Sequence, residues 1–223
     1  MKEQEGILVS DVCGTLFYEN TTLGFIKFHL KEYSKFKFLI FLIITNDVSP
    51  ILWVFKLIER VFSNKDSFFK KLIILFLKGE DEIDIKNSAK LYTNLIFRTK
   101  KIKNVWNFLK KYKNKNYRII LASSSIEPVV KEIAKKIKAE YFSSTLEIKN
   151  LKYTGNILDN IHDNKIKYLK LLGIEYKKID FFFSDNFEDL KLIKNAQKGV
   201  AIVHSFKRSI FWKKNKIKNL LWV

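Results

Sequence analysis

The spacing of hydrophobic and polar positions changes along the chain. A short apolar run at residues 7–9 predicts a buried strand over residues 6–11. From about residue 21 to residue 113, apolar residues recur every three or four positions, a period that predicts amphipathic helices. Beyond residue 118, apolar runs of strand length alternate with helical segments. This alternation predicts an α/β protein with a parallel sheet and helices on both of its faces.

Individual elements can be assigned within this pattern. It predicts strands at 118–122, 179–184 and 199–203, helices at 128–138, 163–172 and 187–196, and a hairpin over 140–157. Within the long helical stretch, Ser49 and Pro50 have the order of an N-cap followed by proline in the first turn, so we expect a helix to begin there.

The composition describes a globular protein with a basic surface. Of the 223 residues, 47% are hydrophobic and 29% are charged, and the formal net charge is +19. Almost all of the positive charge comes from lysine, because arginine occurs only at positions 60, 98, 118 and 208. Since base reading and phosphate clamping favour arginine, we interpret the lysines as a solvated surface and expect no nucleic-acid partner. Attraction to anionic membranes or substrates stays open.

The cysteine and histidine content limits the cellular compartments and the kinds of metal site that the sequence supports. The single cysteine excludes an internal disulfide and fits a reducing cytosol. The residues before Asp11 are acidic and contain no long apolar stretch, so we expect no signal peptide. The histidines have no spacing typical of a zinc site. These features predict a cytoplasmic protein.

Candidate chemistry lies at the ends of the predicted strands. Asp11 closes the first strand, Ser123 closes the second, and Asp185 closes a later one. Lys165 opens a helix, and Asp189 follows Asp185 by one helical turn. In a parallel sheet such strand ends lie along one edge, so these groups can converge. Because aspartate can act as a nucleophile toward phosphorus, the arrangement indicates phosphoryl chemistry.

These motifs resemble the haloacid dehalogenase superfamily of phosphatases, in particular its phosphoserine-phosphatase-like branch. Residues 123–128 resemble that branch's second motif, and residues 184–189 resemble its metal motif. The segment 147–155, followed by Lys165, resembles its strand, glycine turn and lysine. The resemblance covers nearly the whole chain outside residues 20–100.

The resemblance implies specific roles. Asp11 would be the nucleophile, Ser123 and Ser124 would bind the phosphoryl oxygens, and Lys165 would neutralise negative charge. Asp11, the carbonyl oxygen of Cys13 and Asp185 would hold Mg²⁺. Asp189 would order the waters of the metal. The physics agrees, because a hard divalent ion and a lysine remove the repulsion between an anionic nucleophile and a phosphoryl group.

Each residue also has an ordinary structural explanation that the sequence leaves open. Asp11 can be a turn aspartate, and Ser123, Ser124 or Ser125 can cap the helix that starts near Pro128. Lys165 can be a surface lysine. An acid at position 189 can stabilise the N-terminus of its helix.

Cys13 departs from the pattern of the family. Most phosphatases of the superfamily carry a second aspartate two residues after the nucleophile, which protonates the leaving group. A thiol with a pKa of about 8.5 is a poor substitute for a carboxylic acid, and general acid–base assistance is typically worth about 10²–10⁴-fold. The sequence therefore leaves three alternatives: a phosphatase for good leaving groups, a phosphotransferase, or a catalytically impaired module that binds phospho-ligands or membranes.

The resemblance also implies the domain organisation. Residues 1–19 and 101–223 would form a Rossmann-like core, and residues 20–100 an inserted α-helical cap that selects substrates. The cap contains two apolar runs, 36–44 and 51–55, both too short to span a bilayer. They are interpreted either as a buried helical hairpin or as a peripheral membrane contact through residues 36–58 at the cytoplasmic face. In the second case the substrate would be a lipid-linked phosphate rather than a small molecule.

Overall fold

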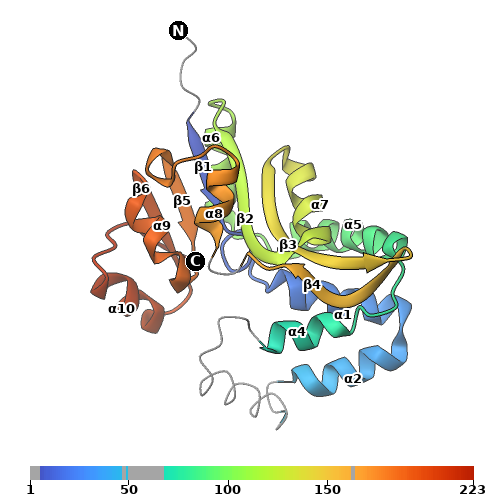
Figure 1. Ribbon diagram of the computed structural model, residues 1–223. Coiled ribbons are helices and arrows are strands. Elements are labelled where there is room, and N and C mark those ends of the chain that lie inside the picture. The colour runs from blue at the N-terminus through green and yellow to red at the C-terminus, as the bar shows by residue number, and fades with distance from the viewer. Residues whose placement is uncertain (1–5, 47–48, 50–67, 162–163) are drawn as a thin grey trace.

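A seven-stranded sheet forms the centre of the molecule, in the order β4-β3-β2-β1-β5-β6-β7 (Figure 1). The computed structural model describes residues 6–46, 49, 68–161 and 164–223. The strands are β1 (Ile7–Ser10), β2 (Arg118–Ile126), β3 (Glu140–Lys149), β4 (Lys152–Asp159), β5 (Phe181–Ser184), β6 (Lys198–Val203) and β7 (Leu220–Trp222). Strands β3 and β4 pair antiparallel and the other neighbours pair parallel. The predicted α/β Rossmann-like fold is confirmed.

The strands are buried on both faces, which explains their continuous apolar runs. Alternate residues point to opposite sides: Leu8 belongs to one core cluster and Val9 to the other. On the Leu8 side the sheet packs against α6 (Lys103–Lys113) and α7 (Glu127–Ile137). On the Val9 side it packs against α8 (Lys165–Leu171), α9 (Leu190–Asn195) and α10 (Phe206–Lys214).

The connection from β1 to β2 is helical, as the periodicity predicts. Its helices are α1 (Thr21–Tyr33), α2 (Lys35–Thr45), α4 (Phe68–Leu75) and α5 (Glu82–Thr99). Asn20 caps α1 by accepting a hydrogen bond from the backbone of Leu23 at 3.1 Å. Helix α4 lies against β4 (Figure 1). The helix start expected at Pro50 and the apolar run 51–55 lie outside the described residues.

Several details differ from the expectation. The predicted hairpin forms, but β4 also extends the main sheet at its edge. The helix expected at 187–196 begins as a tight turn, η2 (Phe187–Asp189), and only then continues as α9. Helix α10 and strand β7 were not predicted, because β7 has only three residues and α10 carries no clear apolar stripe. Among the described helices, none combines the length and apolarity needed to cross a membrane.

Candidate functional site

The carboxyl ends of β1 and β5 bring two carboxylates together. These strands pair in parallel, and the backbone N–H of Asp11 donates to the carbonyl of Phe183 at 2.9 Å. The Thr15 hydroxyl accepts from the backbone of Asp185 at 3.0 Å and donates to its carboxylate at 3.2 Å. Thr15 therefore ties the loop after β1 to the end of β5 and fixes Asp185 beside Asp11.

Gly14 is required by this close approach. Its φ is +63°, a conformation that L side chains rarely adopt. A Cβ at this position would lie 2.4 Å from a carboxylate oxygen of Asp185. Only glycine leaves room for the two loops to meet at this point.

Lys165 connects the nucleophile candidate to the second acidic motif. Its buried ammonium group lies 3.3 Å from Asp11 Oδ1 and 2.6 Å from Asp189 Oδ2. Ser184 also donates to Asp189, at 2.6 Å. Burial by itself lowers the pKa of Lys165, but the two carboxylates raise it above its ordinary value, so the lysine stays charged. Asp189 therefore positions Lys165 against Asp11.

Burial has the largest effect on the pKa values of Asp11 and Asp185. It raises the pKa of Asp11, and Lys165 opposes this effect. It also raises the pKa of Asp185, although Arg208 and His204 lie beside that carboxylate. Asp11 Oδ1 is buried and forms no directed hydrogen bond. The described charges therefore leave the two acids incompletely compensated.

The side chain of Cys13 is held by two hydroxyl groups. Its sulfur lies 2.8 Å from Ser125 Oγ and 3.0 Å from Thr21 Oγ1, and these two oxygens are 2.6 Å apart. Burial, followed by the charge of Asp11, raises the pKa of the Cys13 thiol. The thiol is therefore neutral at physiological pH and cannot act as a general base.

The serines at the end of β2 have different surroundings. Ser123 is fully buried, and its hydroxyl accepts from the backbone N–H of Ser125 at 3.3 Å. Ser124 lines the cavity beside Asp11 and Asp185. Of the predicted phosphate-binding serines, the structure thus places Ser124 at the cavity surface and Ser123 behind it.

Lys70 of α4 joins the helical insertion to the core. It donates to the carbonyl of Ser124 at 2.8 Å, to Ser144 at 2.9 Å and to Asn160 at 2.7 Å. This lysine fixes the backbone next to the cavity, and the sequence pattern contained no signal for it.

The cavity at this edge has a volume of about 570 Å³ and is lined in part by residues that the sequence analysis missed. Arg208 donates to the Asp185 carboxylate at 3.1 Å, and His204 Nε2 lies 2.5 Å from the carbonyl oxygen of Gly14. His204 directly follows β6, so the strand-end argument that found Asp185 also applies to it. Arg208 lies in the first turn of α10, a helix that was not predicted.

The donor set fits a hard divalent cation. Asp11 and Asp185 provide two carboxylates, and Mg²⁺ is commonly held by one or two carboxylates together with waters. Oδ1 of Asp11 is buried, has the Lys165 ammonium group at 3.3 Å and forms no hydrogen bond within the described residues. In the described part of the chain no group of three or more His, Cys, Asp or Glu side chains could hold a metal. A third protein ligand would have to be a backbone oxygen, as predicted for Cys13.

The sequence profile of haloacid dehalogenase-like hydrolases matches residues 8–194. No curated protein matches the chain by sequence.

Solved structures share the fold at low sequence identity. A protein of unknown function from Bordetella pertussis is 13% identical with a TM-score of 0.70, and the match covers 98% of both chains. A haloacid dehalogenase family hydrolase, T0658 from Salmonella enterica serovar Typhi, is 18% identical with a TM-score of 0.65, over 97% of this chain and 66% of that chain. A substrate-bound phosphoserine phosphatase is 16% identical with a TM-score of 0.60, over 99% and 94%.

Proposed function

The chain belongs to the haloacid dehalogenase-like hydrolases, and from this premise we propose that it is a Mg²⁺-dependent phosphatase acting through an aspartyl-phosphate. The observation that carries the proposal is the position of Asp11. It lines a cavity, lies 3.3 Å from a buried lysine, and is adjacent to a second carboxylate, Asp185. A nucleophile, a fixed cation and a candidate metal site thus meet at one point.

In the first step an Asp11 carboxylate oxygen attacks phosphorus, and the bond from phosphorus to the leaving oxygen breaks. Lys165 reduces the repulsion between the two anions, and Asp189 holds Lys165 in place. Bound Mg²⁺ would supply further charge neutralisation at Asp11 and Asp185. Water then attacks the phosphorus of the aspartyl-phosphate, which releases inorganic phosphate and restores the Asp11 carboxylate.

Cys13 limits the second step. The neutral thiol cannot take a proton from water, and its contacts with Thr21 and Ser125 hold it in place. We expect the aspartyl-phosphate to break down slowly and the best substrates to have good leaving groups. The same feature favours the alternative of phosphoryl transfer to an acceptor with its own base. A phospho-ligand-binding module is the further alternative, which any Asp11-dependent turnover would exclude.

The proposal is tested by turnover of an aryl phosphate with Mg²⁺ and with EDTA. We expect Asp11→Asn to abolish turnover, because the amide is not a nucleophile, and Asp185→Ala to abolish Mg²⁺ dependence. A matched control is Asp84→Asn on α5, which removes a carboxylate remote from the cavity lining. Retained activity of a folded Asp11→Asn variant would overturn the mechanism, and calorimetry showing unchanged Mg²⁺ affinity would remove Asp185 from the metal site.

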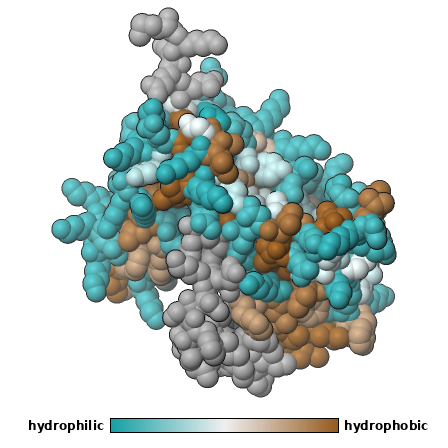
Figure 2. Space-filling model, in the orientation of Figure 1, coloured by the Kyte–Doolittle hydropathy of each residue, from teal (hydrophilic) through white to brown (hydrophobic). Residues whose placement is uncertain are grey.

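A lipid-linked phosphate is the substrate class that the surface of α2 supports. Phe36, Leu39 and Ile43 are spaced along one side of this helix and are 76%, 59% and 63% exposed. Figure 2 shows apolar surface around α2 and α4. Exposed apolar patches mark contacts with membranes or proteins. We propose that this surface contacts the cytoplasmic face of the membrane and brings the cavity to lipid-linked phosphates.

A further inference from the structure

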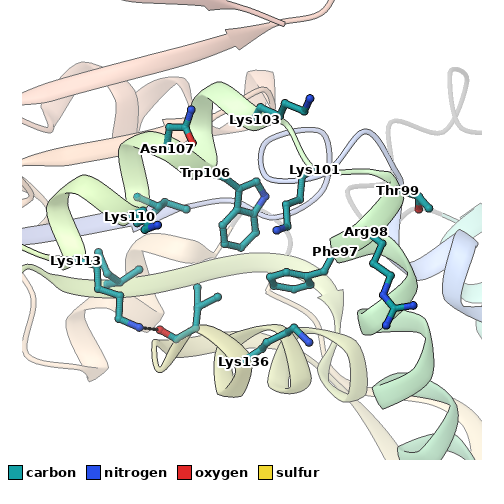
Figure 3. A pocket seen from close by; sticks show the side chains of 13 residues that line it. Phe97, Arg98, Thr99, Lys101, Lys103, Trp106, Asn107, Lys110, Lys113 and Lys136 are labelled. Carbon is teal, nitrogen blue, oxygen red and sulfur yellow. Dashed lines mark hydrogen bonds between the residues drawn. The ribbon is translucent and has the colours of Figure 1, made fainter.

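A second cavity lies between α5, α6 and α7, away from the catalytic carboxylates (Figure 3). Its volume is about 690 Å³, within the range of small-molecule sites. It shares no lining residue with the catalytic cavity, and no carboxylate occurs among its described lining residues. The cationic side chains that line it are Arg98, Lys101, Lys103, Lys110, Lys113 and Lys136.

The cations of this basic cavity form no ion pairs among the described residues. Elsewhere lysines pair with acids, as in Lys86 with Glu82 at 2.6 Å and Lys149 with Glu147 at 2.7 Å. Over the described residues, none of the six cavity cations forms an ion pair with a carboxylate. Two of them instead donate to neutral oxygens: Lys113 to a backbone carbonyl (Figure 3), and Lys136 to the side-chain amide of Asn94. Like charges around one cavity repel one another, so an anion bound among them is stabilised.

The aromatic residues of the cavity are already engaged. Phe97 packs against Trp106 with ring centroids 5.0 Å apart, and both rings contact Phe17 of the core. The ammonium group of Lys101 lies 5.2 Å from the Phe97 ring and 5.7 Å from the Trp106 ring. That of Lys136 lies 5.2 Å from Phe97. A ligand therefore meets ammonium groups instead of open rings, unlike the stacking platforms of single-stranded nucleic-acid sites.

We propose that the basic cavity binds a small anion with several linked phosphate groups, recognised by charge rather than by stacking. A single phosphate carries at most about two negative charges. The six cations of the cavity can interact with a larger number of negative charges. A chain of phosphates offers charged oxygens along its length, which fits cations contributed by three helices. Free polyphosphates and phosphorylated lipid headgroups share this chemistry.

The wall of the basic cavity touches the loop that carries the nucleophile. Trp106 Nε1 donates to the carbonyl of Leu16 at 2.8 Å, and the backbone N–H of Ile102 donates to the same oxygen at 3.0 Å. Leu16 lies on the loop that begins at Asp11. Because Trp106 also lines the cavity, binding is expected to change its fluorescence, a readout independent of enzymatic activity.

The test is calorimetric titration of the full chain, in EDTA, with inorganic triphosphate, ATP and orthophosphate. We expect triphosphate and ATP to bind saturably and with equal affinity, because the adenine of ATP makes no stacking contact. Orthophosphate should bind much more weakly. Replacing Lys103 and Lys110 together by glutamine should lower the affinity for triphosphate about tenfold or more. Neither side chain forms a hydrogen bond, ion pair or ring contact in the described structure, so the variant should fold normally.

The matched control replaces Lys177 and Lys213 by glutamine, which removes the same charge from exposed positions outside the cavity. The control should bind triphosphate as the wild type does. Equal weakening in both double variants, or no saturable binding, would overturn the proposal. Displacement of triphosphate by vesicles that contain a lipid with a pyrophosphate headgroup, but not by vesicles of phosphatidylglycerol alone, would identify a lipid headgroup as the source, and no displacement by either would identify a soluble anion. Since Asp185→Ala should leave this binding unchanged, the result is independent of the proposed phosphatase activity.

Discussion

The sulfur of Cys13 lies 2.8 Å from the hydroxyl of Ser125. This contact ties the side chain two residues after Asp11, the proposed nucleophile, to the end of β2, where the predicted phosphate-binding serines also lie. If Cys13 stands at the position of the general acid, as the resemblance implies, its thiol is poorly suited to that role, because burial raises its pKa. The rate of the enzyme should depend on the leaving group for this reason.

Cys13→Asp should accelerate hydrolysis of alkyl phosphates, by up to about 10²–10⁴-fold, because a carboxylic acid can protonate a poor leaving group. The gain should be smaller for aryl phosphates, whose leaving groups need little protonation. The measurement compares rates of both proteins on one alkyl and one aryl phosphate. The wild type should also accumulate a trappable aspartyl-phosphate.

The matched control is Cys13→Ser, which keeps the size and the hydroxyl contacts but adds no acid. It should stay as slow as the wild type on the alkyl phosphate. If a folded Cys13→Asp variant is no faster on either substrate, Cys13 does not stand in for the missing acid, and the site is adapted to different chemistry.

Lys165→Met should destabilise the fold as well as abolish activity. The substitution leaves the buried carboxylates of Asp11 and Asp189 without their shared cation. Breaking a buried pair in this way typically costs about 3–5 kcal/mol. Urea unfolding measures the loss, with Lys170→Met on the exposed side of α8 as the control. A stability equal to that of the control would show that Lys165 contributes little to the buried network.

Topology explains which parts of the site could be predicted. Asp11 and Asp185 end strands that pair in parallel, so the order of strands alone brings them together. Alternating apolar segments were likewise sufficient for the fold class. The pairing of Lys165 with Asp189 depends on a tight turn at 187–189 and on how α8 approaches the sheet. Neither feature produces a periodic hydrophobic pattern in the sequence.

Other contacts could not be read from local patterns. Thr21 and Ser125, which hold Cys13, are 104 positions apart, Thr21 at the start of α1 and Ser125 near the end of β2. Arg208 reaches Asp185 from α10, whose apolar residues show no stripe that would predict a helix. Such residues are placed by packing of distant elements and not by their neighbours in sequence.

Stability should fall in acid because of Glu80. Burial raises the pKa of this carboxylate, but hydrogen bonds from His29 and Lys37 more than offset this effect and lower it below its ordinary value. A depressed pKa stabilises the folded state above the unfolded pKa of about 4.3, and this contribution is lost as the pH falls through the folded value. The difference in unfolding free energy between wild type and Glu80→Gln should therefore be largest near neutral pH and shrink below about pH 4.3.

Urea midpoints at a series of pH values measure this difference. The control is Glu132→Gln on α7, whose carboxylate has a single lysine neighbour at 3.9 Å. Its effect on stability should be small throughout. A Glu80→Gln difference that stays constant down to pH 3 would show that the network around His29 does not depend on the charge of Glu80.

The apolar surface of α2 should determine membrane association. Flotation with phosphatidylglycerol vesicles should carry the wild type upward, because apolar side chains enter the interface while surface lysines attract the anionic headgroups. Replacing Leu39 and Ile43 by serine removes two of the exposed side chains on one helix face and should reduce flotation strongly. The matched control replaces Leu158 and Leu171, both 71% exposed and outside α2, by serine. Equal flotation of both double variants, or a wild type that stays with the soluble fraction, would exclude α2 as the contact and favour a soluble phosphate substrate.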